Sequence, residues 1–490
     1  MPRIAVIGGG PGGYAAAFEA AAGGAEVTLF EAQRLGGTCL NVGCIPTKTI
    51  LRSAHVLRDL ARVGDFALTG AADLRVDLAA LRERKDAVVD ELVAQVESTA
   101  QRLKVEVVQG QARLDLTGGR FFVSSSAYCG RSVGEGAQAT GRLTPSPPTC
   151  ASRDMAPASF DAVIIATGSE PVVLPALSAP FVWTSDDALA LREIPREIII
   201  VGGGVIGVEF ACAYAAFGAS VHIVELSPGL LPGFDARVVR TLAAALQQQG
   251  VTLHLGTSVE AARDCDGRVV ATLSDGSELE AEVLLSAVGR APRTAGFGFE
   301  DAGLQYDRRA LKVDEHFQTN VAGVFAAGDA IGGMMLAHTA EAEGRAAARN
   351  ALATLAGKAP AATVDYRAIP ACVYTFPEVA TVGLLSAAAK EAGQAPVSGI
   401  AKYAGNGKAL AEGEREGYVE LVADKATGEL LGCAIVGAHA VELIAVAAVA
   451  LTQRQTVADM LGTVFAHPTV SELFHAAAQA VAAKLEASAR

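Results

Sequence analysis

Short apolar runs alternate with glycine turns and alanine-rich stretches along much of the chain. Residues 3–31 begin with the apolar run RIAVI, pass through a glycine turn into an alanine-rich stretch, and end on a second apolar run that closes with Glu31. Residues 197–225 repeat this order and close with Glu225. A short apolar run bounded by turn residues favours a buried strand, and an alanine-rich stretch favours a helix. The pattern therefore predicts two strand–helix–strand units and an α/β fold.

Both units carry the spacing Gly-x-Gly-x-x-Gly at the turn between strand and helix. The glycines are Gly8, Gly10 and Gly13 in the first unit and Gly202, Gly204 and Gly207 in the second. The first glycine permits a tight turn, the second lets a pyrophosphate approach the backbone, and the third lets helix pack on strand. In both units an acid stands 23 residues after the first glycine, where a carboxylate accepts hydrogen bonds from ribose hydroxyls. The chain therefore predicts two dinucleotide sites, one for a ligand held permanently and one for a ligand that exchanges.

The second acid, Glu225, bears on the choice of nucleotide. A carboxylate at this position repels a 2′-phosphate, and the first arginine after it is Arg237. The second site is therefore predicted to bind NAD rather than NADP.

A pair of cysteines follows the first unit directly. Cys39 and Cys44 are separated by four residues, and Lys48 follows four residues later. Their place just past Glu31 puts them beside the first dinucleotide. A helix N-terminus or a nearby cation favours a thiolate, and a helix that starts near Cys44 would carry Lys48 on the same face. We therefore expect a redox-active pair.

Composition narrows the class of protein. The chain has 490 residues, half of them apolar, which is enough for three or four domains. A net charge of −13 argues against the basic surface that nucleic-acid binding needs. Residues 198–218 are apolar but interrupted by five glycines and Glu209, so they predict a buried strand and helix rather than a membrane span. Without a signal-peptide pattern at its start, we expect a cytoplasmic protein that binds no membrane.

Seven segments resemble the pyridine nucleotide–disulfide oxidoreductases, over almost the whole chain. They are GGTCLNVGCIPTK (36–48), IIATGSEP (164–171), GGGVIGVEFA (202–211), SAVGRAPRT (286–294), VFAAGDAIGGMMLAHTAEAEG (324–344), IPACVYTFPEVATVG (369–383) and FAHPTVSE (465–472). The resemblance implies two Rossmann-like dinucleotide-binding domains and a C-terminal α+β dimerisation domain. It implies an FAD domain at 1–175, an NAD domain at 176–287, a central segment at 288–357 that completes the FAD site, and an interface domain at 358–490. It also implies a homodimer whose active sites lie across the interface.

The resemblance assigns site residues position by position. For a tightly bound FAD, one per subunit, it implies Gly8, Gly10, Gly13, Glu31, Gly37, Thr38, Lys48, Ala112, Thr167, Gly168, Asp329 and Ala337. For NAD it implies Gly202, Gly203, Gly204, Val205, Ile206, Glu209, Glu225, Val259, Ala287, Val288, Gly289 and Arg290. It makes Cys39 the sulfur that exchanges with substrate and Cys44 the sulfur that faces the flavin. Lys48 and Glu209 are expected to form an ion pair near the flavin ring.

His467 and Glu472 are the predicted acid–base pair. Oxidation of a dithiol needs a base that takes a thiol proton, and histidine has a suitable pKa at neutral pH. A carboxylate bonded to the other ring nitrogen would orient the imidazole and stabilise its charged form. The segment FAHPTVSE supplies both groups five residues apart. Four other histidines, His55, His222, His254 and His316, show no such context. Cys212, Cys372 and Cys433 are expected to be small core residues.

Within the family, the motifs are most similar to members that oxidise dihydrolipoamide with NAD⁺. The partner would be a lipoyl-carrier protein or the lipoyl domain of a multienzyme complex, and docking in a complex would add to catalysis. The alternative is an NAD(P)H-dependent reductase of another low-molecular-weight or protein disulfide. Glutathione-type reductases place basic residues where Glu225 stands, mercuric reductases carry a C-terminal cysteine pair that is missing after Cys433, and soluble transhydrogenases lack the disulfide.

Residues 124–159 depart from the family pattern. This segment is rich in Ser, Gly, Ala, Pro and Thr, where family members cross between strands in far fewer residues. We interpret it as an insertion in the FAD domain, an exposed loop or hairpin. It is either a neutral surface insertion or a docking element for a particular carrier. Cys129 and Cys150 lie within it and leave a second disulfide or a metal pair open.

Overall fold

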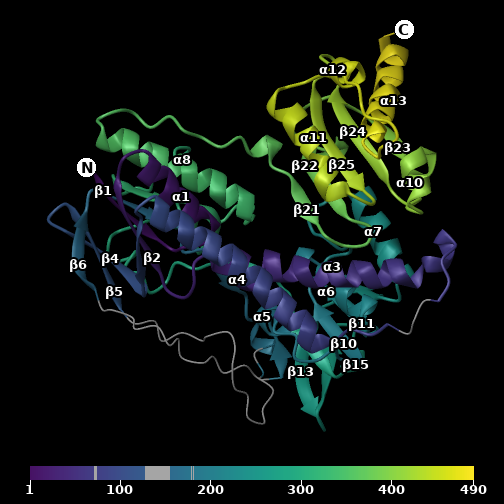
Figure 1. The fold of residues 1–490 in the computed structure, drawn as a ribbon, viewed down its shortest axis with the longest axis horizontal. Coiled ribbons are helices and arrows are strands. Elements are labelled where there is room, and N and C mark those ends of the chain that lie inside the picture. Colours follow the sequence, from purple (N-terminus) through teal and green to yellow (C-terminus); the bar gives the residue numbers. More distant parts are fainter. Residues whose placement is uncertain (71–73, 127–154, 178, 180, 490) are drawn as a thin grey trace. The chain divides into compact units, whose positions relative to one another are not determined.

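The computed structural model describes residues 1–70, 74–126, 155–177, 179 and 181–489. These residues form two compact units (Figure 1). The first comprises 1–50, 77–193 and 285–364, and the second comprises 51–76, 194–284 and 365–490. The α/β class predicted from the sequence is confirmed, whereas the four-region division of the chain stays a prediction.

A parallel sheet of order β20-β7-β1-β2-β3 forms the centre of the first unit. Its strands are β1 (Arg3–Ile7), β2 (Glu26–Glu31), β3 (Glu106–Gln109), β7 (Ala162–Ile165) and β20 (Val324–Ala326). Chain order reverses at β1, with β2 on one side of it and β7 on the other. In parallel sheets, ligands bind at the carboxyl ends of the strands beside such a reversal. The topology therefore marks the edge that follows Ile7 as a ligand crevice.

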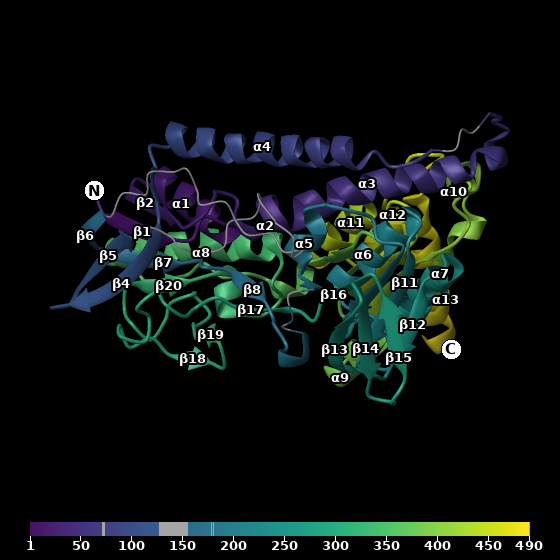
Figure 2. The same ribbon diagram turned by 90° about the horizontal axis from the view of Figure 1, so that it is seen from below.

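Alternate residues of β1 face two different covers, which explains why the strand is apolar throughout. Ile4 and Val6 pack on the side of the helices, while Ala5 and Ile7 pack on the side of a second, three-stranded sheet. The helices are α1 (Pro11–Ala22), α4 (Leu78–Arg102) and α8 (Ala337–Leu355), and the second sheet holds β4 (Gln111–Thr117), β5 (Arg120–Ser126) and β6 (Met155–Phe160). Figure 1 shows α1 and α8 side by side, and Figure 2 shows α4 running past α1.

The ends of the predicted insertion lie on two paired strands. β5 and β6 pair antiparallel, with Phe121 opposite Phe160. Residues 127–154, including Cys129 and Cys150, lie outside the described residues, so the expectations for them stay untested. The first unit also contains α2 (Gly37–Val42), β8 (Ser169–Pro171), β9 (Val182–Trp183), α5 (Ser185–Leu189), β17 (Arg290–Pro292), β18 (Tyr306–Asp307), β19 (Ala310–Leu311) and the short 3₁₀ helix η3 (Gly328–Ile331). Helix α3 (Cys44–Ala61) begins in the first unit and ends in the second.

The second unit repeats the strand–helix–strand arrangement at its own glycine loop. Here β10, β11 and β12 run parallel, and α6 follows β10. The elements are β10 (Glu197–Val201), α6 (Val205–Ala216), β11 (Ser220–Glu225), α7 (Ala236–Gln248), β12 (Thr252–Leu255), β13 (Val259–Cys265), β14 (Arg268–Leu273), β15 (Glu278–Ala281) and β16 (Val283–Ser286). The prediction of a buried strand and helix over 198–218 is confirmed.

The C-terminal part of the second unit is an antiparallel sheet packed against helices. Its order is β21-β22-β25-β24-β23. The elements are β21 (Ala371–Val373), β22 (Val379–Gly383), α9 (Ser386–Glu391), β23 (Pro396–Lys402), α10 (Gly407–Ala411), β24 (Tyr418–Asp424), β25 (Leu430–Val436), α11 (Ala440–Thr452), α12 (Val457–Gly462) and α13 (Glu472–Ala489). Phe474 of α13 and Ile444 of α11 join its core. Cys433 lies in this core and Cys212 is buried in α6, as predicted, while Cys372 is partly buried against the same core.

Candidate functional site

The first glycine loop follows the carboxyl end of β1 and leaves no room for side chains. Gly8 has a φ of +106°, and a Cβ there would lie 2.2 Å from the Ala166 carbonyl oxygen. A Cβ on Gly13 would lie 1.7 Å from the Gly8 carbonyl oxygen. Both contacts are far below any van der Waals distance, so only glycine fits. The tight turn and the close packing of helix on strand, which the sequence predicts for the first and third glycines, are present.

The second glycine of this loop stands at an uncapped helix end. Gly10 is the N-cap of α1, and no side chain accepts from the first turn of that helix. The amide groups and the helix dipole at such an end favour an anion. Gly10 also lies against Gly37, because a Cβ built on Gly37 would be 2.6 Å from the Gly10 Cα. The segment that begins at Gly37 and carries the cysteines therefore packs directly on the loop.

Glu31, the last residue of β2, is fixed by backbone amides. Gly9 N–H donates to its Oε2 and Gln33 N–H donates to its Oε1, both at 2.7 Å. Burial raises the pKa of this carboxyl, and the amides of Gln33 and Gly9 act in the opposite direction. The side chain is thus held in one orientation at the edge of the sheet.

The other residues predicted for FAD come from neighbouring strand ends in the same unit. Thr167 follows β7 and Asp329 follows β20, and Ser169 Oγ donates to Asp329 Oδ2 at 2.6 Å. Within the described chain, the hydroxyl oxygens of Thr167 and Thr339 are buried and have no hydrogen-bond partner. Ala337 opens α8, whose N-cap, Leu336, offers no side-chain cap. A cradle of uncapped helix ends and unpartnered hydroxyls fits an anionic ligand with several acceptor oxygens.

The second glycine loop reproduces the first in the second unit. Gly202 has a φ of +107°, and a Cβ on Gly207 would lie 1.9 Å from the Gly202 carbonyl oxygen. Glu225 accepts from Gly203 N–H and Ser227 N–H, both at 2.7 Å. Gly204 is the uncapped N-cap of α6. Val205, Ile206 and Val259 lie with this loop in the second unit, as does Glu209, which is buried in α6 and accepts from Tyr374 N–H at 3.0 Å.

The last residues predicted for NAD, Ala287 to Arg290, belong to the first unit. Arg290 donates to Ser169 Oγ at 2.8 Å and to Thr38 Oγ1 at 3.3 Å. Its guanidinium therefore joins residues predicted for the FAD site. The ion pair expected between Lys48 and Glu209 stays a prediction.

Cys39 and Cys44 lie on either side of a helix junction. Cys39 is in α2 and Cys44 is the first residue of α3, with Lys48 one turn further along that helix. Both are thiols in the structure and they share a hydrogen bond, so the disulfide itself stays a prediction. The hydrogen bond with Cys44 and burial raise the pKa of the Cys39 thiol, and Lys48 opposes them. These effects favour the protonated form of the Cys39 thiol.

His467 and Glu472 are brought together at the start of α13. Nδ1 of His467 lies 2.9 Å from Oε1 of Glu472, and Thr469 N–H donates to Oε2 at 3.0 Å. The Thr469 amide and then the histidine hold the pKa of the Glu472 carboxyl below its usual value. The His467 side chain is 80% exposed and its other ring nitrogen, Nε2, takes no part in this bond. The pair has the arrangement of an oriented base and its carboxylate.

The sequence did not single out several residues that the structure places among these groups. Ser169 bridges Asp329 and Arg290, although the three are far apart along the chain. Tyr14 and Arg345 both donate to Glu341, a residue of α8, at 2.7 Å. The spacing of Glu341 and Arg345, four residues apart, is a sequence signal for a helical ion pair, but it does not indicate which residue lies opposite.

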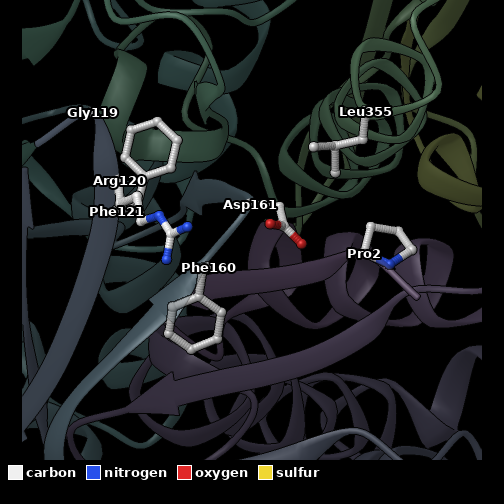
Figure 3. A pocket seen from close by; sticks show the side chains of 7 residues that line it. All are labelled: Pro2, Gly119, Arg120, Phe121, Phe160, Asp161 and Leu355. Atoms are coloured by element: carbon white, nitrogen blue, oxygen red, sulfur yellow. The ribbon is translucent and has the colours of Figure 1, made fainter.

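A separate hollow lies at the other edge of the first sheet (Figure 3). It is lined by residues at the amino ends of strands, such as Pro2 before β1 and Asp161 before β7. Arg3 N–H already donates to Asp161 at 2.8 Å. The hollow is therefore on the opposite edge from the residues predicted to bind a dinucleotide.

Among the described residues, no helix combines the length and the apolar character that a bilayer crossing requires.

Two family models match the chain. The model described as pyridine nucleotide-disulphide oxidoreductase matches residues 2–344, and the model of the dimerisation domain of the same family matches residues 369–478.

Similar curated proteins cover nearly the whole chain. A protein named dihydrolipoyl dehydrogenase from Haloferax volcanii is 37% identical over 486 residues, which are 97% of this chain and 95% of that protein. Proteins of the same name from Chlorobaculum parvum and Bacillus subtilis are 39% and 36% identical, over 97% of this chain and 96% and 97% of their own lengths.

Two solved structures are similar to this chain over nearly its whole length. The crystal structure of LpdA from Mycobacterium tuberculosis matches with a TM-score of 0.86 and 27% identity, covering 98% of this chain and 99% of that chain. The HOCl-induced flavoprotein disulfide reductase RclA from Escherichia coli matches with a TM-score of 0.80 and 26% identity, covering 98% of this chain and all of that chain. The chain belongs to the pyridine nucleotide-disulphide oxidoreductase family, whose members are flavin- and nicotinamide-dependent enzymes.

Proposed function

We propose that this chain is an NAD-dependent dihydrolipoyl dehydrogenase that oxidises protein-bound dihydrolipoamide to lipoamide. The observation that carries the proposal is the hydrogen-bonded thiol pair of Cys39 and Cys44, on a segment packed against an uncapped glycine loop. Relatives of the same length at 36–39% identity bear the name dihydrolipoyl dehydrogenase, which supports the choice of substrate.

FAD is the ligand proposed for the first unit. When bound, it accepts two electrons from a thiolate and passes a hydride to a nicotinamide. Gly8, Gly10 and Gly13 would let its pyrophosphate reach the N-terminus of α1, and Glu31 would hold a ribose. The unpartnered hydroxyl of Thr167 would bond a polar atom of the ligand. The other residues proposed for FAD are Gly37, Thr38, Gly168, Asp329 and Ala337, together with Ala112, which is buried in β4.

NAD⁺ is proposed for the second unit, on the loop from Gly202 to Ile206. Glu225 is already held by two amides and would accept from a ribose while repelling a 2′-phosphate. Val259 and the segment from Ala287 to Arg290 complete the proposed NAD residues. Glu209 is proposed to pair with Lys48 and so to fix the lysine that tunes the flavin.

The chain's own groups carry out the thiol chemistry in balanced steps. His467 removes a proton from one substrate thiol, and Glu472 stabilises the charged imidazole. The resulting thiolate attacks Cys39, so that a substrate–Cys39 bond forms as the Cys39–Cys44 bond breaks and Cys44 leaves as a thiolate. The second substrate thiol then attacks the first substrate sulfur, which closes the substrate disulfide and releases Cys39 to take up a proton. Two electrons have moved from the substrate to the cysteine pair.

Cys44 is suited to the thiolate role by its position. It opens α3, an 18-residue helix whose N-terminus stabilises negative charge, and Lys48 stands one turn away. Because the chain carries the family's dimerisation domain, we propose that the working enzyme is a homodimer. Its partner would be a lipoyl-carrier protein or the lipoyl domain of a multienzyme complex.

Steady-state kinetics with free dihydrolipoamide tests the proposal. We expect NAD⁺ to be reduced with a kcat/KM at least tenfold above that for NADP⁺. Cys44→Ser should abolish turnover, and His467→Ala should lower kcat by about 100-fold or more, in the range of general acid–base catalysis. The matched control is His475→Ala, at a histidine of α13, the helix that begins at Glu472; it should leave kcat unchanged. Preferential NAD(P)H-dependent reduction of glutathione disulfide would contradict the proposed substrate.

A further inference from the structure

The segment that carries Cys39 and the start of α8 both pack on the first turn of α1, and α8 brings a carboxylate that the thiol chemistry above does not use. Gly37, at the start of α2, lies against Gly10 at the start of α1. Further along α1, a Cβ on Gly12 would lie 3.2 Å from the Ala340 carbonyl oxygen of α8. Cys39 and Glu341 therefore sit on two segments that pack against the same first turn of α1.

The Glu341 carboxylate is held from both sides. Tyr14 donates its hydroxyl to Oε1 and Arg345 donates Nη2 to Oε2, each at 2.7 Å. Tyr14 is one turn into α1, where its amide donates to the Gly10 carbonyl at 2.9 Å. The carboxylate is therefore fixed in place by the same helix that carries the glycine loop.

Charge effects link this carboxylate to Cys39. The negative charge of Glu341 raises the pKa of the Cys39 thiol, as a smaller contribution than Cys44 and burial. Burial raises the pKa of the Tyr14 hydroxyl, and Glu341 and Cys39 raise it further, so Tyr14 stays protonated and keeps donating. The effect is therefore a fixed negative charge near Cys39, partly balanced by Arg345.

Charged or ionisable groups face Cys39 from several neighbouring helices. Cys44 and Lys48 on α3 and Glu341 on α8 each shift the pKa of its thiol. On α4, which also packs on α2, Asp90 is paired with Arg34 at 2.8 Å. On α5, Asp186 lies beside Arg290, which donates to Thr38. Of these three acids, Glu341 is the one whose charge raises the pKa of the Cys39 thiol.

We propose that Glu341, held by Tyr14 and Arg345, is a positioning residue that keeps the proton of the reduced pair on Cys39 and leaves the thiolate on Cys44. The inference rests on the proposed function, in which Cys39 exchanges with the substrate and Cys44 leaves as the thiolate. A carboxylate near Cys39 disfavours a thiolate there, whereas the start of α3 and Lys48 favour one at Cys44. When the substrate disulfide closes, Cys39 leaves as a thiolate, and Glu341 promotes its protonation.

The rate at which Cys39 is alkylated, followed against pH, tests the inference without any substrate. The flavin-loaded protein is reduced with excess tris(2-carboxyethyl)phosphine, desalted, and treated with iodoacetamide. Fragmentation of the tryptic peptide 35–48, which holds both cysteines, separates label on Cys39 from label on Cys44. Glu341→Gln should move the Cys39 midpoint down by about 0.5–1 pH unit and raise its alkylation rate about two- to fourfold below the midpoint. Glu341→Asp, which keeps the charge, should restore most of the wild-type profile.

Arg345→Gln gives a test of opposite sign. This change removes the cation paired with the Glu341 carboxylate, so the negative charge near Cys39 is less balanced. The pH midpoint of Cys39 alkylation should therefore move upward. The matched controls are Glu19→Gln and Arg349→Gln, which break an ion pair of 2.7 Å between the same two helices and should leave the profile unchanged. An unchanged profile in both Glu341→Gln and Arg345→Gln, or shifts of the same sign, would overturn the inference. If Glu341→Gln loses its flavin, Arg345→Gln still decides, and because no lipoamide or NAD⁺ is used, the result is independent of the proposed substrate.

Discussion

The two glycine loops have nearly the same local geometry and different surroundings. Glu31 and Glu225 each accept two backbone amides at 2.7 Å, and Gly8 and Gly202 share a φ near +106°. Around the first loop, however, a Cβ on Gly10 would lie 3.8 Å from the Gly37 Cα, whereas a Cβ on Gly204 would have no other described residue within 4 Å.

Helix α8 also packs on the first loop, whereas the second loop has a larger side chain at the corresponding position. A Cβ on Gly344 of α8 would lie 2.1 Å from the Gly12 carbonyl oxygen, while the second loop has Ile206 where the first has Gly12. The same strand–turn–helix motif is thus enclosed by neighbouring segments in the first unit, whereas the second loop is open at Gly204. Enclosure suits a ligand that stays bound, and openness suits one that exchanges at every turnover.

The largest effect is expected where a side chain would collide with the enclosed loop. Gly13→Ala places a Cβ 1.7 Å from the Gly8 carbonyl oxygen, so the turn that faces the ligand must shift. The purified variant should hold less than a tenth of the flavin of the wild type, as measured by visible absorbance per subunit. Full flavin content in Gly13→Ala would show that the first site does not depend on this packing.

The open loop should respond differently to an added methyl group. The Cβ of Gly204→Ala would have no atom of another described residue within 4 Å, so the thermal midpoint and flavin content should match those of the wild type. Its Cβ would occupy the space through which a phosphate approaches, and kcat/KM for NAD⁺ should fall about 30- to 100-fold, equivalent to about 2–3 kcal/mol. Wild-type kinetics with NAD⁺ would contradict the placement of NAD at this loop.

The two ribose acids should separate the two ligands. Glu225→Gln removes the charge that repels a 2′-phosphate, and the ratio of kcat/KM for NAD⁺ to that for NADP⁺ should fall about tenfold. Glu31→Gln is the matched change in the other unit and should lower flavin retention while leaving this ratio unchanged. A fall in the ratio with Glu31→Gln alone would reverse the assignment of the two sites.

The smallest expected effect concerns stability of the second unit at acid pH. Burial lowers the pKa of His55 to about 4, and its ring packs edge-on against Phe376 with centroids 4.0 Å apart. Since the unfolded chain takes up this proton near pH 6.5 and the folded chain only near 4, the free energy of unfolding should fall between these values. His55→Gln should remove about 1–2 kcal/mol of that fall, allowing for the partial exposure of the ring. Urea unfolding of the wild type and of His55→Gln at pH 7 and pH 4.5 measures this difference. If the free energy of unfolding depends equally on pH in the two proteins, His55 is not the cause.

Local spacing was sufficient to predict the tight turns of the two glycine loops, because each depends on residues close together in the chain. The roles of Glu31, Glu225 and the cysteine pair stay predictions. Contacts between distant segments could not be read in the same way. Ser169 and Asp329 are 160 residues apart, Thr38 and Arg290 are 252 apart, and Tyr14 and Glu341 are 327 apart. The alanine-rich stretch after the first glycine turn predicts α1 as a helix, but not that Gly12 and Gly344 let α1 and α8 touch. The residues next to His55 in the sequence do not indicate its burial, because its ring packs against Phe376, a residue of another segment.

Anaerobic titration with dihydrolipoamide tests the central claim that the enclosed site and its cysteine pair feed electrons to the open site. Without NAD⁺, the protein should take up about two electrons per subunit and gain two alkylatable thiols, at Cys39 and Cys44. With NAD⁺ present, each dihydrolipoamide consumed should yield one NADH, and Cys44→Ser should yield none. NADH formation at the wild-type rate in Cys44→Ser, or reduction without new thiols on peptide 35–48, would contradict the account.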